Sequence, residues 1–453
     1  MYNLMRGFKI LGGGTDDMKC LFVTIALVLI ASALFFPAGA EGKESESDFS
    51  RGSVRLSYFK DVEMDFQLLR SLGADAAGGG AAGEILEAAR NIEDGSPSSW
   101  SAAFLSLAER LEADGNARLE RGHQVSARES LLRAAPYYRA AEYYGDPSSA
   151  TTAQWGMRCR DVFLRAMGLS PWKTESVLIP FGRDKDFLPG YFISPSRGSG
   201  RRKTLLAQSG YDGTAEEMYF SVGKAALERG YNVLLFDGPG QTGKRRFHPD
   251  STFVPDTAPA LRAVVNYALS RPDVHSGKIA LYGASFGGYF ALSGAVGEGR
   301  LGAVIANSPL LDAQEYFFAS MGPQFVAMFQ KEDLTVEEIR AIPEKDLPEK
   351  YRLSLLNLCI RYGKPSVKGV LDGLRDFRLR DDQVRSLSMP ALGMISEGEG
   401  AVPLSQAKRF AELAPRASLH IFEEESGANI HCQLDNMPLS WAVALDWLDE
   451  QFR

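Results

Sequence analysis

The chain is poor in the residues that build metal sites and disulfide frameworks. Its 453 residues include only four cysteines and five histidines. The cysteines are far apart in the sequence, at Cys20, Cys159, Cys359 and Cys432. This spacing excludes a dense disulfide framework and the short repeats of zinc sites, and leaves room for at most one bridge in an oxidising compartment. No cofactor is expected.

Runs of basic residues are absent as well. Aspartate and glutamate together number 57 against 50 lysines and arginines, which gives a formal net charge of −7. A nucleic-acid partner is therefore not expected, because such proteins carry concentrated positive charge. The expected partner is a small-molecule substrate.

Only one long apolar run is present, at residues 21–36, and small residues follow it up to Ala40. A basic residue, an apolar run and an A-x-A site in this order predict a secretory signal peptide over residues 1–40, with Met18 as an alternative start. An uncleaved membrane anchor is the weaker alternative, because the run is short for a bilayer span. We expect an exported protein, periplasmic or secreted, with no stable membrane insertion after cleavage.

Residues 50–170 have a helical pattern, in which apolar side chains recur three and four residues apart. They predict an amino-terminal helical domain over 41–172. Pro136 falls inside one of these helices, where it is expected to kink or divide it. Four tyrosines nearby are expected mostly to pack helix against helix, and one or two of them to line a cleft if the domain covers one: Tyr137, Tyr138, Tyr143 and Tyr144.

From residue 174 onward, short apolar strands alternate with amphipathic helices. This alternation predicts an α/β fold, with a mainly parallel sheet and helices on both faces, over residues 173–453. A largely helical stretch at about 311–387 interrupts it and is interpreted as an insertion over the cleft.

The centre of this region is the segment 278–291, an apolar strand that leads directly into a helix through GASFG. Gly283, Ser285 and Gly287 form the G-x-S-x-G pattern, in which small residues allow a sharp turn that presents the serine hydroxyl above the sheet. An incidental serine in a glycine-rich turn is the alternative. The strand before the motif and the helix after it favour Ser285 as a nucleophile.

A serine nucleophile needs a base, and with this motif the acid and then the histidine follow the serine in the chain. His431 lies in a loop after the strand at 418–422, where the base is expected. His420 lies inside that strand. The other three histidines precede the serine: His123, His248 and His275.

The acid is expected in the loop SEGEGAVP at 396–403, which follows the strand at 391–395. Matching Val402 and Pro403 to the usual form of this loop places the acid at Glu399. Glu397 is the near competitor, and Asp312 is a third candidate.

The developing oxyanion needs two donors. The first is expected to be the backbone N–H of Phe286, directly after the nucleophile. The second is expected to be the N–H of Tyr211, in the loop 209–214, where Gly210 permits a tight backbone. Asp212 is expected to cap the helix that begins near Thr214, and Asp237, in a turn, is expected to be structural.

Four motifs in order resemble those of the α/β-hydrolases grouped with 2,6-dihydroxypseudooxynicotine hydrolase, fungal polyketide-pathway hydrolases and fermentation/respiration-switch-type esterases. They are SGYDGTAEEM at 209–218, FDGPGQ at 236–241, GASFGG at 283–288 and HCQ at 431–433. The helical stretch 126–142 is similar to the amino-terminal helical domain of that group. The resemblance implies a Ser/His/acid hydrolase whose site lies between the helical domain and the sheet, and a homodimer as one possible assembly.

Two features depart from this group. Its carbon–carbon bond hydrolases carry a carboxylate after the DGPGQ turn, where this chain has Thr242-Gly-Lys244, and relatives usually have aspartate in place of Glu399. The sequence thus favours a serine hydrolase of esters or related acyl bonds. Three alternatives stay open: an exopeptidase of the prolyl-oligopeptidase type, a carbon–carbon bond hydrolase of a β-dicarbonyl compound, and a catalytically inactive binding module.

Overall fold

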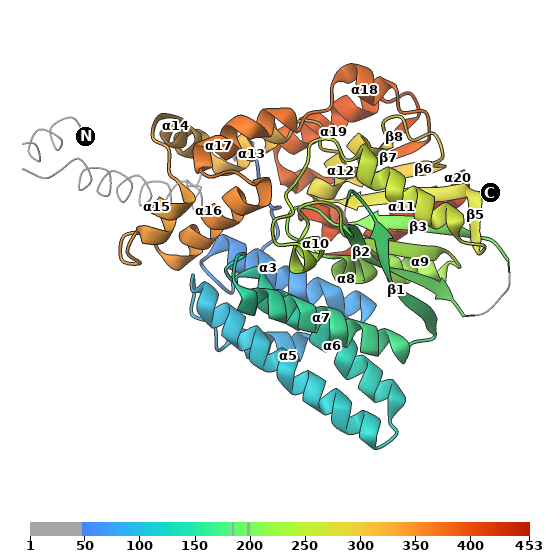
Figure 1. Cartoon of the computed structure of the whole chain (residues 1–453), viewed down its shortest axis with the longest axis horizontal. Helices are drawn as coiled ribbons and strands as arrows, with labels where there is room; N and C mark the ends of the chain where they lie inside the picture. Colours follow the sequence, from blue (N-terminus) through green and yellow to red (C-terminus); the bar gives the residue numbers. More distant parts are fainter. Residues whose placement is uncertain (1–47, 184, 197–199) are drawn as a thin grey trace, which may run out of the picture.

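A computed structural model describes residues 48–183, 185–196 and 200–453. The expected signal peptide therefore lies outside the described residues. Eight strands form one sheet, in the order β1-β2-β4-β3-β5-β6-β7-β8 (Figure 1). The strands are β1 (Trp172–Pro180), β2 (Phe187–Pro195), β3 (Arg202–Gln208), β4 (Asn232–Phe236), β5 (Val274–Ala284), β6 (Ala303–Asn307), β7 (Ala391–Ser396) and β8 (Ala417–Phe422).

The sheet is mainly parallel, as predicted. Strand β2 pairs antiparallel with β1 and β4, and every pairing from β4 to β8 is parallel. The inner strands are buried on both faces, which explains why they appear in the sequence as short continuous apolar runs. The carboxyl ends of β5, β6, β7 and β8 therefore lie side by side at one edge of the sheet.

Side chains of alternate residues enter two different cores, one on each face. In β3, Leu206 belongs to one core, whereas Leu205 and Ala207 belong to the other. The first core is covered by α11 (Ala258–Ser270), α12 (Phe286–Ala295) and α19 (Ala401–Leu413). The second is covered by α8 (Ala215–Met218), α9 (Lys224–Glu228) and α20 (Met437–Gln451). A π-helical turn, Tyr219–Gly223, joins α8 to α9.

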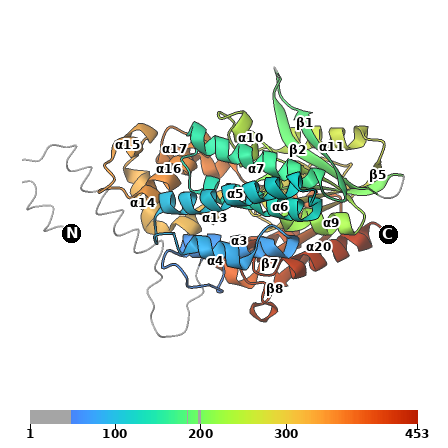
Figure 2. The same cartoon turned by 90° about the horizontal axis from the view of Figure 1, so that it is seen from below.

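In the described part of the chain, five α-helices precede the sheet and pack against its second core (Figures 1 and 2). Phe163, for example, contacts Tyr191 of β2 with a ring separation of 5.0 Å. The five helices are α3 (Val62–Gly73), α4 (Ala82–Ala89), α5 (Pro97–Glu120), α6 (Gln124–Tyr143) and α7 (Ala150–Gly168).

Pro136, which was expected to kink or divide its helix, does not divide it, because α6 is one helix from Gln124 to Tyr143. Helix α6 packs between α5 and α7, and its side chains at Ala134, Ala135 and Tyr137 are fully buried. These contacts outweigh the loss of one backbone hydrogen bond at the proline.

Six helices lie between β6 and β7, where the sequence indicated a helical interruption, and one further short helix, α10 (Thr242–Phe247), follows β4. The six are α13 (Ala313–Met321), α14 (Pro323–Lys331), α15 (Val336–Ala341), α16 (Glu349–Tyr362), α17 (Val367–Gly373) and α18 (Asp381–Arg385). No described helix combines the length and the apolar character that a membrane span requires.

Candidate active site

Ser285 occupies a sharp turn between β5 and α12. Its backbone has φ 59° and ψ −130°, a region that costs a non-glycine residue about 1–3 kcal/mol and is found mostly at functional sites. A Cβ at Gly283 would lie 1.9 Å from the carbonyl oxygen of Gly287, and one at Gly287 would lie 2.5 Å from that of Ser209. The two glycines of the motif are therefore required by the close approach of backbone to backbone.

His431 lies beside this serine. It follows β8 in the chain, and its Nε2 is 2.8 Å from Ser285 Oγ. Its Nδ1 is 2.5 Å from Glu399 Oε2. The structure thus brings together the three side chains that the sequence singled out as nucleophile, base and acid, each from the carboxyl end of a different parallel strand.

Glu399 is the carboxylate that reaches the histidine. Its side chain is fully buried and also accepts hydrogen bonds from the Ser308 hydroxyl at 3.1 Å and the Ser396 N–H at 3.1 Å. Glu397 is exposed to solvent. Asp312 instead caps α13, where it accepts a hydrogen bond from the N–H of Glu315 at 3.1 Å. Of the three candidate acids, the geometry therefore favours Glu399 over Glu397 and Asp312 as the group that orients His431.

The four other histidines lie elsewhere. His123 is exposed at the start of α6, and His275 is exposed and accepts a hydrogen bond from the Gly277 N–H. The ring of His248 packs on Phe187, and that of His420 packs on Phe422 within β8.

The surroundings of His431 favour its charged form. Burial lowers the pKa of the imidazole, but Cys432, Tyr316 and Glu399 together outweigh burial and hold the pKa well above its ordinary value. The imidazolium that His431 forms when it accepts a proton from Ser285 is therefore stabilised by its surroundings.

The loop 209–214 approaches the nucleophile turn closely. A Cβ at Gly210 would lie 2.7 Å from the backbone nitrogen of Phe286 and 2.8 Å from Ser285 Cβ. Among the described residues, the N–H groups of Phe286 and Tyr211 have no protein acceptor. The Tyr211 ring packs against Phe253 and Phe317, with ring separations of 5.5 Å and 5.9 Å, and this fixes the loop.

A cavity of about 100 Å³ opens next to Ser285 and His431. Its remaining walls come from Arg51, the end of β5, helices α3, α5 and α6, the segment 209–221, and the residues before and within α20. Tyr143 is the member of the tyrosine cluster that lines it. None of the described lining residues belongs to the segment 311–387, so the expected insertion does not form the wall of this cavity.

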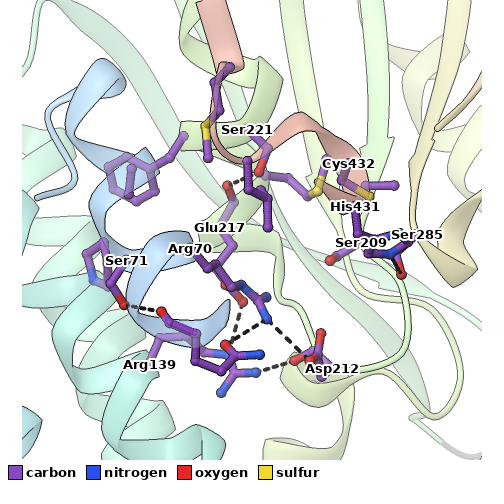
Figure 3. Close-up of a pocket in the computed structure, with 18 of the residues that line it drawn as sticks. Arg70, Ser71, Arg139, Ser209, Asp212, Glu217, Ser221, Ser285, His431 and Cys432 are labelled. Carbon is purple, nitrogen blue, oxygen red and sulfur yellow. Dashed lines mark hydrogen bonds and ion pairs between the residues drawn. The ribbon is translucent and has the colours of Figure 1, made fainter. Parts of the chain in front are cut away.

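An ionic cluster forms one side of the cavity, apart from Ser285 and His431 (Figure 3). Arg70 donates hydrogen bonds to Asp212 at 3.2 Å and Glu217 at 2.6 Å, and Arg139 donates to Glu217 at 3.0 Å and to the carbonyl of Asp212. Burial would raise the pKa of Asp212, but Arg70 and Arg139 outweigh it and hold the pKa below its usual range.

Asp212 does not cap the following helix, contrary to the expectation. Thr214 does so, because its side chain accepts from the Glu217 N–H at 3.4 Å and the Glu217 carboxylate accepts from the Thr214 N–H at 3.1 Å. Asp237 is buried and accepts from the Ala215 N–H at 3.2 Å, which supports its structural interpretation.

Several residues of the site carried no signal that singled them out in the sequence. Ser308 supports the acid and follows β6, so its position at the end of a parallel strand was the one available hint. Arg51 and Arg70 line the cavity from segments without a recognised motif, and Arg139 and Glu217 line it from the stretches 126–142 and 209–218, in which neither was assigned a role.

Comparison with known proteins points to hydrolases. A family model described as X-Pro dipeptidyl-peptidase (S15 family) matches residues 130–353, a range that includes Ser285 but neither Glu399 nor His431. "Hydrolase ORFZ" of Pyricularia oryzae is 28% identical over 355 residues, covering 74% of this chain and 82% of the relative. "Alpha/beta hydrolase xenA" of Xenoacremonium sinensis is 33% identical over 261 residues, covering 55% of this chain and 60% of the relative.

Solved structures show the same fold. The crystal structure of 2,6-dihydroxy-pseudo-oxynicotine hydrolase superposes with a TM-score of 0.62 at 21% identity, covering 83% of this chain and 94% of that one. AbyA5 superposes with a TM-score of 0.58 at 17% identity, covering 86% and 93%. The fungal relatives and the shared fold confirm the resemblance that the sequence motifs indicated: the chain is a hydrolase with the α/β-hydrolase fold.

Proposed function

We propose that this protein is a serine hydrolase that cleaves an ester or a related acyl bond through an acyl-enzyme. The observation that carries the proposal is the continuous chain of hydrogen bonds from Ser285 through His431 to Glu399, with separations of 2.8 Å and 2.5 Å, at the wall of a cavity. Hydrogen bonding of a hydroxyl to a base that is itself oriented by a carboxylate is the arrangement that activates a serine.

In the first half of the reaction, Ser285 Oγ attacks the substrate carbonyl carbon while His431 Nε2 accepts the hydroxyl proton. Glu399 holds the imidazole through Nδ1 and stabilises its positive charge. When the tetrahedral intermediate collapses, the bond to the leaving group breaks and the imidazolium returns the proton to the leaving oxygen. In the second half, His431 removes a proton from water, which attacks the acyl carbon and frees Ser285.

The N–H groups of Phe286 and Tyr211 are assigned as donors to the oxyanion. Both are unpaired within the described chain, and Gly210 keeps the space before the Phe286 amide open. Donors held in place before the reaction stabilise the developing charge without the cost of reorganising water.

Gly210→Ala is therefore expected to lower kcat by about 10²- to 10³-fold, the loss that follows removal of one oxyanion donor. The added methyl group would meet the Phe286 nitrogen and Ser285 Cβ, which are both within 2.8 Å of its position. Steady-state kinetics with a p-nitrophenyl ester measures the effect, and thermal melting reports whether the fold is kept. Gly83→Ala is the matched control, since its Cβ meets nothing within 4 Å. Unchanged kcat in a folded Gly210→Ala variant would remove this loop from the mechanism.

An exopeptidase is the second candidate, because the matching family model describes a dipeptidyl-peptidase. Such an enzyme has to bind the α-ammonium group of its substrate, for which a free carboxylate is suited. Asp212 and Glu217, the carboxylates of the described cavity lining, are already paired with Arg70 and Arg139. Because these carboxylates are already paired, an ester is favoured over a peptide as the substrate.

The proposal is tested by labelling the protein with a fluorophosphonate and by comparing three substrate classes. We expect labelling, a burst of p-nitrophenol from p-nitrophenyl esters, and slower turnover of aminoacyl anilides and of a β-diketone. Failure of the wild type to react with the probe would favour a binding module. A preference for the anilides or the diketone would favour a peptidase or a carbon–carbon bond hydrolase.

A further inference from the structure

Residues 48–53, here called the strap, cross the two loops that hold the acid and the base. The Ser50 N–H donates to the Glu399 carbonyl at 2.9 Å, and the His431 N–H donates to the Arg51 carbonyl at 2.9 Å. A Cβ at Gly52 would lie 2.5 Å from the Cα of Ile430, so the strap lies directly on the loop of the base. These contacts fix the backbone of Arg51 beside the catalytic groups, and its side chain lines the cavity.

Arg51 differs from the two other arginines that line the cavity. Arg70 and Arg139 both donate hydrogen bonds to acceptors in the ionic cluster. The Arg51 side chain has no hydrogen bond to any described residue, and its one ion-pair partner in that part of the chain, Glu63, lies 3.7 Å from its Nε. The four N–H donors on the two terminal nitrogens of this permanently charged group therefore have no acceptor in the described part of the chain.

The neighbours of Arg51 hold it in place without using these donors. Its guanidinium carbon lies 4.9 Å from the centre of the Phe66 ring, a cation–π contact. Glu63 is held by hydrogen bonds to its Oε1 from the Tyr143 hydroxyl at 2.7 Å and the Gln67 amide at 2.8 Å, and its Oε2 is the oxygen that lies 3.7 Å from Arg51 Nε. The Arg51 guanidinium is thus oriented in advance and awaits an acceptor.

We propose that Arg51 binds a carboxylate of the substrate, so that the preferred substrates are esters or acyl compounds that also carry a carboxylate. The planar guanidinium fork matches a carboxylate in two parallel hydrogen bonds. Since the strap joins Arg51 to the His431 loop, this contact would fix the distance between the substrate carboxylate and the carbonyl that Ser285 attacks. The inference rests on the proposed function of Ser285.

Two esters that differ in one group test it: p-nitrophenyl pentanoate, and p-nitrophenyl hydrogen glutarate, in which a carboxylate replaces the terminal methyl. In Arg51→Met, the ratio of the KM of the glutarate ester to that of the pentanoate ester is expected to rise about 10- to 100-fold, the loss of a charge-assisted hydrogen bond. A change in the strap that affects the binding of both esters equally does not alter this ratio of KM values. Arg55→Met is the matched control, because Arg55 pairs with Asp65 and does not line the cavity, and it should leave the ratio unchanged.

The Glu63→Gln variant is expected to change this KM ratio in the opposite direction. It removes the competing charge near Arg51 while keeping a side chain that accepts from Tyr143, so the same KM ratio is expected to fall. A ratio that stays constant in both Arg51→Met and Glu63→Gln would overturn the proposal.

Binding of glutarate, measured by calorimetry with the Ser285→Ala variant, separates this proposal from the proposed function. Arg51→Met in that background is expected to weaken glutarate binding about 10-fold or more. Weakened binding without any ester hydrolysis by the wild type would support the carboxylate site and refute the hydrolase mechanism. Hydrolysis of both esters with glutarate binding independent of Arg51 would refute the carboxylate site alone.

Discussion

Ser285→Ala is expected to lower kcat for ester hydrolysis by about 10⁶-fold, the size of loss seen when the serine of a catalytic triad is removed. The hydroxyl oxygen of Ser285 forms the bond of the acyl-enzyme. His431 Nε2 lies 2.8 Å from this oxygen and is positioned to accept its proton. The remaining rate would come from substrate binding and the oxyanion donors alone. Stopped-flow and steady-state assays with a p-nitrophenyl ester measure the change.

The same variant should lose covalent labelling by a fluorophosphonate, while its melting temperature stays at or above that of the wild type. Ser285 has φ 59°, so the turn is strained in either variant and the loss of one hydroxyl does not remove a structural hydrogen bond to the backbone. Ser209→Ala is a suitable control, because Ser209 also lines the cavity but makes no hydrogen bond to His431. Persistent labelling of Ser285→Ala would assign the nucleophile to another residue.

Glu399→Gln is the second change with a large expected effect, a fall in kcat of about 10⁴-fold. The carboxylate is fully buried and accepts hydrogen bonds from His431, Ser308 and the Ser396 amide. A carboxamide in its place would hold the imidazole in the wrong tautomer or leave a buried donor unpaired. Glu397→Gln, at the exposed neighbouring position, is the matched control and should keep nearly full activity.

The pH profile provides an independent measure of the same contact. His431 acts as a base only when neutral, and its pKa is held above the ordinary value, with Glu399 among the groups that raise it. Activity of the wild type is therefore expected to rise with pH through the neutral and mildly alkaline range. Loss of the Glu399 charge should lower the pKa and move the rise of the residual activity to lower pH. An unmoved profile in Glu399→Gln would mean that another group orients the histidine.

The sequence by itself determined the elements that depend on local patterns. The apolar run before Gly283 and the small residues around Ser285 specify a buried strand, a tight turn and a helix, since the backbone contacts of the turn exclude a Cβ at Gly283 and Gly287. Alternation of strands and helices specifies a parallel sheet, whose carboxyl ends meet at one edge. That rule was enough to select His431 and to rank Glu399 first, and in the structure His431 lies beside Ser285 and Glu399 lies beside His431.

Only the tertiary structure decided which charged residues line the cavity and which helices cover it. Arg51 is one of 50 basic residues and carries no local signal. It reaches the cavity because the strap forms hydrogen bonds with Glu399 and His431, which lie more than 300 residues further along the chain. The continuous course of α6 through Pro136 was settled in the same way. The cap at Thr214 differs, because Thr214 and Glu217 form a capping box that the local sequence encodes. Contacts between distant segments depend on how complete elements pack, and a local sequence pattern does not encode them.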